Sequence, residues 1–323
     1  MARTRLYRNG VLELENFPVE DISEYLTDPA ATVWLDMCAP DEHDLAAISE
    51  ELDLHQLAVE DAVHKHQRPK LDRYDTHLFL SAYEVTLDRS THRPLAAEVA
   101  VFVTHNALVT VRASADFAID EVVARWDAST DLAEHGVAFL LHGLLDHVVD
   151  SHFTAVSALD EEIEDLQEVL FADGRTDRLI QERSFTLRRG LVLLRRVVLP
   201  TREVVNALMR RDLHVLDEAM LPYFQDVYDH VLRVSEWTES LRDLVATVME
   251  TNLTIQGNRL NTIMKQVTSW AAIIAVPTAV TGFYGQNVPY PGFGERAGFW
   301  ASIEITLALS VILYFLFRRR NWL

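Results

Sequence analysis

The feature that most constrains this 323-residue chain is an apolar run near its carboxyl end, from Thr268 to Gly285. Within that run only the side chain of Tyr284 is ionisable. A helix needs roughly 20 such residues to cross ~30 Å of hydrocarbon. A second apolar run, from Gly298 to Phe317, leads into three consecutive arginines at 318–320. The sequence therefore predicts two helices that span a lipid bilayer.

Basic residues predict how these helices are oriented, because they favour the cytoplasmic side of a membrane. Arg259 and Lys265 precede the first span, and the three arginines follow the second. We therefore expect a protein of the cell membrane with both ends of the chain in the cytoplasm. The predicted parts are a cytoplasmic α/β domain at 1–130, a helical region at 131–265, spans at 266–285 and 298–317, an external loop at 286–297 and a basic tail at 318–323.

The charge of the chain narrows the classes of function. Asp and Glu number 49 against 29 Lys and Arg, a formal net charge of −20. Such a chain repels phosphate, so we expect no nucleic-acid partner, whereas its acidic surfaces attract cations. The sequence has no G-x-x-x-x-G-K-[ST], G-x-G-x-x-G or G-x-S-x-G motif. These absences argue against ATP-driven, dinucleotide and ester chemistry, so we do not expect an enzyme.

The amino-terminal part predicts a sheet with helices packed on it. β-Branched and aromatic runs between turn residues predict strands at 32–37, 78–85, 97–103 and 108–111. Asp41 is expected to cap a helix that runs from Glu42 to His55. No segment after Asp116 is typical of a strand. The pattern favours an α+β fold, with the sheet confined to the first domain.

Helices dominate the rest of the cytoplasmic part. An acidic pattern from Val137 to Phe171 and a basic one from Thr176 to Arg211 flank a turn that contains Gly174. Their opposite charges predict an antiparallel hairpin with ion pairs between the helices. From Pro222 to Gly282, apolar residues recur every three or four positions. This spacing predicts one long helix that continues into the first span and associates with copies of itself.

The inner part of that helix carries a stripe of small or weakly polar residues. Its members, three or four positions apart, are Asn261, Met264, Thr268, Ala271, Ala275, Thr278 and Gly282. Small residues allow membrane helices to pack closely, which is one explanation. The other is that the stripe lines a pore, with Met264 and Val267 as its hydrophobic constriction. Asn258 and Asn261 at the inner end and Asn287 at the outer end favour the pore, because amide oxygens suit a hydrated cation.

At this point the chain resembles the CorA family of divalent-cation channels. That family has a Tyr-Gly-Met-Asn motif after the first membrane helix, and this chain has Tyr284-Gly285-Gln286-Asn287. The segments 66–70 (HQRPK) and 222–230 (PYFQDVYDH) are also similar to segments of the family, and they occur in the same order. The resemblance therefore extends over nearly the whole chain.

The resemblance implies a homopentameric, funnel-shaped channel for Mg²⁺ or Co²⁺ whose long helices line the pore. The Gly285 carbonyl and the Asn287 amide would form a selectivity filter for largely hydrated Mg²⁺. This agrees with the reluctance of Mg²⁺ to lose water. Gln286 replaces the usual methionine and could add a ring of ligands. Glu295 in the external loop could attract cations, although the family's Met-Pro-Glu-Leu segment is missing.

The resemblance also implies regulation by the transported ion. Asp226 matches an aspartate that binds regulatory Mg²⁺ together with an acidic residue of a neighbouring subunit. Asp88 is the candidate partner, and Glu84 competes with it. Two facing carboxylates repel each other, so Mg²⁺ between them would hold subunits together in the closed state, and its loss would open the pore.

Two alternative functions stay open. The first is a transporter of Zn²⁺ or Co²⁺ in the same family. The second is a two-span sensor or scaffold that conducts nothing. Separately, the histidines at 142, 147 and 152 could suggest a metal site. Their five-residue spacing places successive histidines about 140° apart around a helix, so we do not expect them to share an ion.

Overall fold

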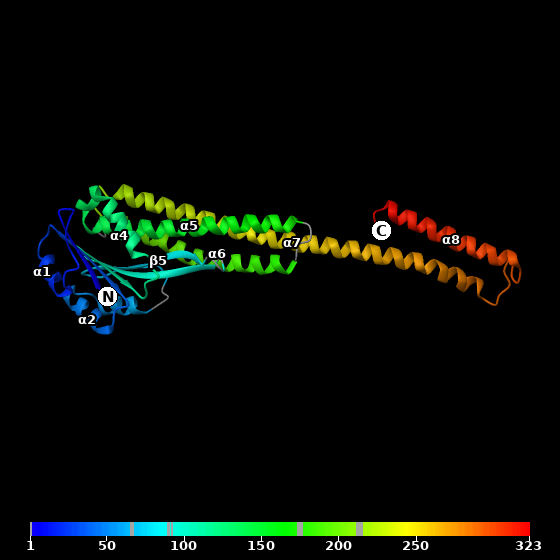
Figure 1. The fold of residues 1–323 in the computed structure, drawn as a ribbon, viewed down its shortest axis with the longest axis horizontal. Helices are drawn as coiled ribbons and strands as arrows, with labels where there is room; N and C mark the ends of the chain where they lie inside the picture. Colours follow the sequence, from blue (N-terminus) through cyan, green and yellow to red (C-terminus); the bar gives the residue numbers. More distant parts are fainter. Residues whose placement is uncertain (1, 65–67, 89–90, 92, 173–176, 211–215) are drawn as a thin grey trace. The chain divides into compact units, whose positions relative to one another are not determined.

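The computed structural model describes residues 2–64, 68–88, 91, 93–172, 177–210 and 216–323. The chain divides into two compact units, Met1–Val248 and Met249–Leu323. The first contains a sheet and most of the helices, and the second contains the two apolar segments (Figure 1).

The first unit is built on a seven-stranded sheet with the order β2-β1-β3-β7-β6-β5-β4. The strands are β1 (Ala2–Arg8), β2 (Val11–Glu15), β3 (Ala31–Cys38), β4 (Lys70–Arg73), β5 (Leu78–Asp88), β6 (Arg93–Val103) and β7 (Ala107–Arg112). The pair β3–β7 is parallel, and the other neighbours are antiparallel. The described residues after Arg112 contain no strand. The predicted α+β class is therefore confirmed.

Two details of the first domain differ from the prediction. The strands β1, β2 and β4 were not predicted. The helix expected from Glu42 to His55 is wrong in its length, because α2 (Glu42–Glu51) ends four residues earlier. Asp53 then has a φ of 50°, which a helix does not allow, and His55 caps the next helix by accepting a hydrogen bond from the Leu57 amide. The predicted cap at Asp41 is correct: its carboxylate accepts a hydrogen bond from the Asp44 amide at 2.8 Å.

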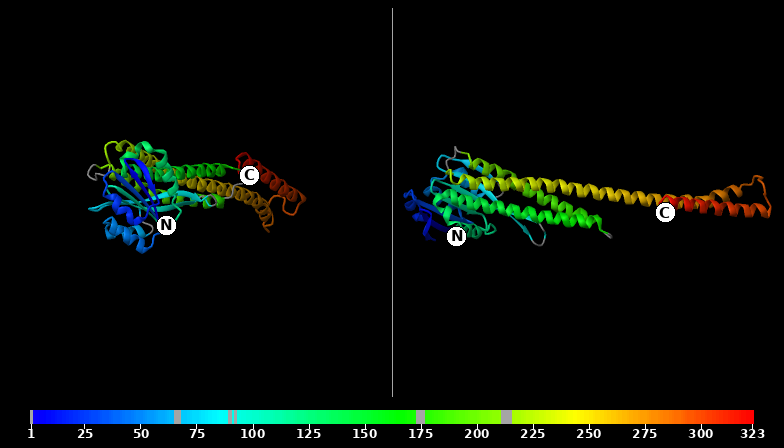
Figure 2. Two further views of the ribbon diagram at one scale, coloured as in Figure 1. Left: turned by 60° about the vertical axis from the view of Figure 1, so that its left-hand side comes forward. Right: turned by 90° about the horizontal axis from the view of Figure 1, so that it is seen from above.

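Helices cover both faces of this sheet. The short helices α1 (Ile22–Leu26), α2 and α3 (Gln56–Val63) pack on one face through a core that includes Leu35, Ile48 and Phe102. On the other face lie α4 (Ile119–Ala128) and α5 (Val137–Phe171), which contact the sheet near Trp34 (Figure 2).

Three long helices form a bundle beside the sheet. The helix α5, α6 (Asp177–Leu208) and the first part of α7 (Leu221–Tyr284) lie side by side (Figure 1). Arg183 of α6 donates to Glu162 of α5 at 2.9 Å, which confirms the predicted ion pairing of this hairpin. The Trp237 indole of α7 donates to Asp160 of α5 at 3.0 Å. The expected turn at Gly174 lies outside the described residues.

The second unit consists of the end of α7, a loop and α8 (Arg296–Arg319), which runs back from the loop in the direction opposite to α7 (Figures 1 and 2). Pro277 lies inside α7 without ending it. By length and composition α7 and α8 can each cross a membrane, because they contain 18-residue windows with mean hydropathies of 1.4 and 1.9. Both predicted spans are therefore helices.

Candidate functional site

The predicted pore stripe lies on an uncovered face of α7. All of its members are exposed within this chain, and so is Val267 of the predicted constriction: Asn261, Met264, Thr268, Ala271, Ala275, Thr278 and Gly282. From Gly257 to Thr268 every residue is exposed, so this part of α7 is open on all sides. Further along, Ser269 is fully buried and Ile273 and Val276 are half-buried. The single chain thus leaves the stripe free either to pack against a neighbour or to line a pore.

The end of α7 positions the predicted filter. The Gly285 amide donates to the Thr281 carbonyl at 2.8 Å, and the Gln286 amide donates to the Phe283 carbonyl at 3.2 Å. These bonds satisfy two of the last helical carbonyls, which otherwise have no partner within the helix. Gly285, Gln286 and Asn287 are exposed, and within the described chain the side chains of the last two make no hydrogen bond. Their amide oxygens are therefore available to a ligand.

An aromatic cluster that the sequence analysis did not anticipate lies directly beside the filter. It comprises Phe283 and Tyr284 from α7 and Tyr290 and Phe293 from the loop. The Tyr284 and Tyr290 rings meet edge to face at 4.9 Å between centroids, and the Tyr290 and Phe293 rings do so at 5.2 Å. The Tyr290 hydroxyl also donates to the Tyr284 carbonyl at 3.2 Å. The sequence signal is the placement of two aromatic residues shortly after an aromatic helix end.

The other end of the loop is closed by two glycines. Gly292 has a φ of 87°, a conformation that side chains disfavour. Gly298 in the first turn of α8 is buried against it, and a Cβ at Gly298 would collide with the Gly292 carbonyl. Glu295 is exposed immediately before α8, and its side chain does not cap that helix. Its carboxylate is therefore accessible at the surface of the loop.

The predicted regulatory residue Asp226 lies on the first unit's part of α7. Its side chain is 69% exposed and lies 3.5 Å from the Nδ1 atom of His230. The neighbouring Phe224 is fully buried and packs edge-on against His142 of α5 at 5.7 Å. The helix is thus fixed on one face, while Asp226 points outward on the other.

The two candidate partners of Asp226 differ in accessibility. Asp88 ends β5, is half-buried, and accepts a hydrogen bond from the Thr91 hydroxyl at 2.9 Å. Glu84 is buried; its carboxylate accepts a hydrogen bond from the Ala118 amide at 2.7 Å and lies 3.3 Å from His147. Because the Glu84 carboxylate is engaged inside the domain, Asp88 is the more accessible of the two carboxylates.

The three evenly spaced histidines have separate environments. His142 packs on Phe224, His147 contacts Glu84, and His152 donates from Nε2 to the Tyr83 carbonyl at 2.7 Å. Burial lowers the pKa of His152 to about 4, because the imidazolium is poorly solvated there. Across the described residues, no three His, Cys, Asp or Glu side chains lie close enough to hold one metal ion.

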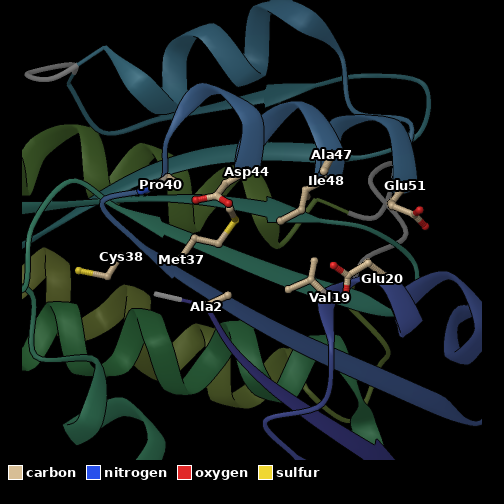
Figure 3. Close-up of a pocket in the computed structure, with 10 residues that line it drawn as sticks. All are labelled: Ala2, Val19, Glu20, Met37, Cys38, Pro40, Asp44, Ala47, Ile48 and Glu51. Atoms are coloured by element: carbon tan, nitrogen blue, oxygen red, sulfur yellow. The ribbon is translucent and has the colours of Figure 1, made fainter.

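A cavity of about 480 Å³ lies in the amino-terminal domain (Figure 3). It is bounded by the end of β3 and by α2, and Cys38, Asp44 and Glu51 are among its lining residues. Among its described lining residues three side chains are acidic and none is basic. None of the described lining residues comes from α7 or α8, which carry the predicted ion path.

Comparison with known proteins identifies the family. The family described as "CorA-like Mg2+ transporter protein" matches residues 29–319. Over its full length the chain is 27% identical to the cobalt/magnesium transport protein CorA of Thermotoga maritima, of which it covers 95%. It is also 23% identical to the zinc transport protein ZntB of Pectobacterium atrosepticum, with 79% of this chain and 77% of that protein covered.

The fold gives an independent comparison. The complete structure of the CorA magnesium transporter from Methanocaldococcus jannaschii matches with a TM-score of 0.80 at 21% identity, and the match covers 100% of this chain and 99% of that one. This likeness confirms the predicted arrangement of a mixed-sheet domain, a long helix and two carboxyl-terminal apolar helices. The family is one of transporters, in agreement with the prediction that the chain is not an enzyme. Because the family match extends over nearly the whole chain, the chain belongs to the family of CorA-like Mg²⁺ transporter proteins.

Proposed function

We propose that this protein is a homopentameric channel that admits divalent cations, chiefly Mg²⁺, through the cell membrane into the cytoplasm. The observation that carries this proposal is the uncovered stripe on α7, which ends at the exposed oxygens of Gly285, Gln286 and Asn287. Five copies arranged around an axis would enclose these oxygens as rings. Neutral oxygens suit Mg²⁺ that keeps most of its water, because they bind the hydration shell without trapping the ion.

The membrane potential suffices to drive such a flux. Moving one charge across 100 mV is worth ~2.3 kcal/mol, so a divalent ion gains ~4.6 kcal/mol on entering a cell at about −100 mV. This energy corresponds to about three decades of concentration ratio. We therefore propose passive influx. We also propose that both ends of the chain lie in the cytoplasm, because the basic residues Arg259, Lys265 and Arg318, which flank the two spans, favour that side of the membrane.

Flux of divalent cations into liposomes that contain the purified full chain tests the proposal. We expect Mg²⁺ uptake that the potential accelerates, and we expect Asn287→Ala to abolish it without dissociating the oligomer. Asn206→Ala provides the matched control, because Asn206 is an exposed asparagine on α6. Absence of flux for every divalent cation would favour the sensor or scaffold. Unchanged uptake by Asn287→Ala would remove Asn287 from the mechanism.

The ion preference is the second question, since one relative is named a zinc transport protein and another a cobalt/magnesium transport protein. We favour Mg²⁺ because hard oxygens occupy the filter, whereas Zn²⁺ prefers nitrogen and sulfur ligands. Competitive uptake of Mg²⁺, Co²⁺, Ni²⁺ and Zn²⁺ distinguishes these cases. Gln286→Met is expected to fold normally, and a changed ion preference in this variant would make Gln286 part of the filter.

We also propose that internal Mg²⁺ regulates the channel by binding to Asp226 and Asp88 between neighbouring subunits. Asp226 is mostly exposed, and among the described residues of its own chain its cationic partner is His230 alone, which supports a role in contacts between copies. Asp88 is preferred over Glu84 because the Glu84 carboxylate is buried and hydrogen-bonded. Mg²⁺ would stabilise the closed state by the difference of its affinities for the two states.

A further inference from the structure

The proposed filter follows the end of a helix, where the backbone has few partners of its own. Gly285, Gln286 and Asn287 are exposed, and the side chains of the latter two make no hydrogen bond within the described chain. A filter that discriminates between hydrated ions needs its oxygens held within a fraction of an ångström. Some group outside the three residues must therefore restrict them.

Tyr290 contacts the residue that immediately precedes the filter. Its hydroxyl donates to the Tyr284 carbonyl at 3.2 Å. Nearby, the Thr281 and Phe283 carbonyls are occupied by the amides of Gly285 and Gln286. The Gly285 carbonyl, by contrast, accepts no hydrogen bond from any described residue. The bond from Tyr290 thus fixes the Tyr284 carbonyl in place and leaves the next carbonyl of the chain free for an ion's water shell.

The Tyr290 ring adds a second attachment to the same helix end. It meets the Tyr284 ring at 4.9 Å and the Phe283 ring at 6.3 Å, while Phe293 covers it from the loop at 5.2 Å. Aromatic pairs at these separations are stabilising beyond the area they bury. The ring therefore connects the helix to the loop, and the hydrogen bond sets its orientation.

The backbone around Tyr290 is also stiff, because Pro289 precedes it and Pro291 follows it. A proline fixes its own φ and disfavours the helical region for the residue before it. Tyr290 thus stands on a restricted segment, and its hydroxyl closes a short loop that starts at Tyr284. The three filter residues lie inside this loop, so both of their ends are held.

We propose that Tyr290 is a positioning residue of the ion filter: its hydroxyl and ring hold the helix end at Tyr284 and so orient the Gly285 carbonyl and the Asn287 amide. This role rests on the proposed function, since it presupposes a filter at these residues. Tyr290 itself does not contact the ion. It determines how precisely the oxygens of the three filter residues are placed, and hence both the affinity and the discrimination of the filter.

The test compares full-length variants in liposomes. Tyr290→Phe removes the hydroxyl and keeps the ring, and Tyr290→Ala removes both. Tyr314→Phe is the matched control, because it deletes a tyrosine hydroxyl from α8, where Arg318 contacts it at 3.4 Å. Three quantities are measured for each: the fraction of assembled oligomer, the Mg²⁺ concentration that gives half-maximal flux, and the ratio of Mg²⁺ to Ca²⁺ flux.

For Tyr290→Phe we expect the half-saturating Mg²⁺ concentration to rise roughly threefold to tenfold, the range that loss of one neutral hydrogen bond gives. The Mg²⁺ to Ca²⁺ ratio should fall, and Tyr290→Ala should show larger changes. The control should match the wild type. A purely structural role would reduce only the assembled fraction, so an unchanged half-saturation and ratio in Tyr290→Phe would overturn the proposal, even if Tyr290→Ala fails to assemble. A wild type without divalent flux would instead overturn the proposed function, and this role with it.

Discussion

Arg112 of β7 and Asp36 of β3 form a buried, two-pronged ion pair between the two parallel strands. The Nε atom of Arg112 donates to Oδ1 of Asp36 at 2.9 Å, and one terminal nitrogen donates to Oδ2 at 2.5 Å. Thr110 donates to the same carboxylate at 2.8 Å and receives the Trp34 indole N–H at 3.2 Å. The pair thus joins the only parallel neighbours of the described sheet, and Thr110 links its carboxylate to the indole of Trp34 within β3.

Removing one member of this pair should destabilise the cytoplasmic unit strongly. Arg112→Ala leaves the Asp36 carboxylate buried without its partner, and such a loss costs about 3–5 kcal/mol. Replacing both residues by apolar ones, as in Asp36→Leu with Arg112→Met, should cost much less, because no charge is then left buried. Urea unfolding followed by tryptophan fluorescence measures both. Equal losses in the single and double variants would contradict this account.

The buried His152 should make the stability of this unit depend on pH. Its pKa is lowered from 6.5 to about 4 by burial, so the folded form stays neutral where the unfolded form takes up a proton. Its contribution is therefore complete above about pH 6.5 and falls as the pH decreases toward 4. His152→Gln should flatten this part of the profile, while the exposed His64→Gln should not. Burial also lowers the pKa of His77 and His142, so part of the slope should remain.

Elements with strong local patterns could be predicted from the sequence. The predicted helix Val137–Phe171 agrees with α5 at both ends, because its apolar period is uninterrupted. The two apolar spans are also helices, since their length and composition leave few alternatives. Neither result depends on residues distant in the sequence.

The missed features depend on distant contacts or on local backbone geometry. The arginines of β1 are typical of a solvent-exposed, charged segment. In the structure, however, Arg5 is buried between Glu15 and Asp127, and Asp127 lies in α4. Likewise, the pattern of apolar and polar residues along β5 could not show that the Glu84 side chain points inward, where it accepts a hydrogen bond from the Ala118 amide. The early end of α2 depends on the positive φ of Asp53, which the apolar spacing does not reveal.

The candidate site also combines features set by local sequence patterns with features set by contacts that the sequence does not show. Its stripe could be predicted because the helical period alone places those residues on one face of α7. Tyr290 could not, because its role depends on the loop folding back so that its hydroxyl reaches the Tyr284 carbonyl. Sequence spacing says little about such loop geometry.

If Met264 forms the hydrophobic constriction, a polar side chain there should make the closed channel leak. Met264 is 68% exposed on the stripe of α7, and Val267 one turn further is 63% exposed. Rings of apolar side chains block ions by excluding water, and a hydroxyl restores hydration. Met264→Ser should therefore raise Mg²⁺ leak at high internal Mg²⁺. Ile312→Ser on α8, also exposed in this chain, is the control for a polar substitution in the apolar region. A leak equal to that of the wild type would locate the constriction elsewhere.

The regulatory role of Asp226 predicts Mg²⁺-dependent protection from protease. If Mg²⁺ bridges carboxylates between subunits, wild type should resist cleavage at high Mg²⁺ and be cut when Mg²⁺ is removed. Asp226→Lys supplies a permanent positive charge opposite the partner carboxylate, so it should resist cleavage even without Mg²⁺. Asp88→Asn should remove one carboxylate and weaken the dependence on Mg²⁺ if Asp88 is that partner.

The control for this experiment is Asp243→Lys, a charge reversal on the same helix at a side chain that is 73% exposed. It changes the net charge of α7 as Asp226→Lys does, but it lies more than four helical turns away, so it should leave the Mg²⁺ dependence unchanged. Protection by both lysine variants would indicate a general effect of charge on a chain of net charge −20 and not a bridge at Asp226. A wild type that is cut equally with and without Mg²⁺ would contradict regulation by the transported ion, because a ligand can shift an equilibrium only by binding one state more tightly than the other.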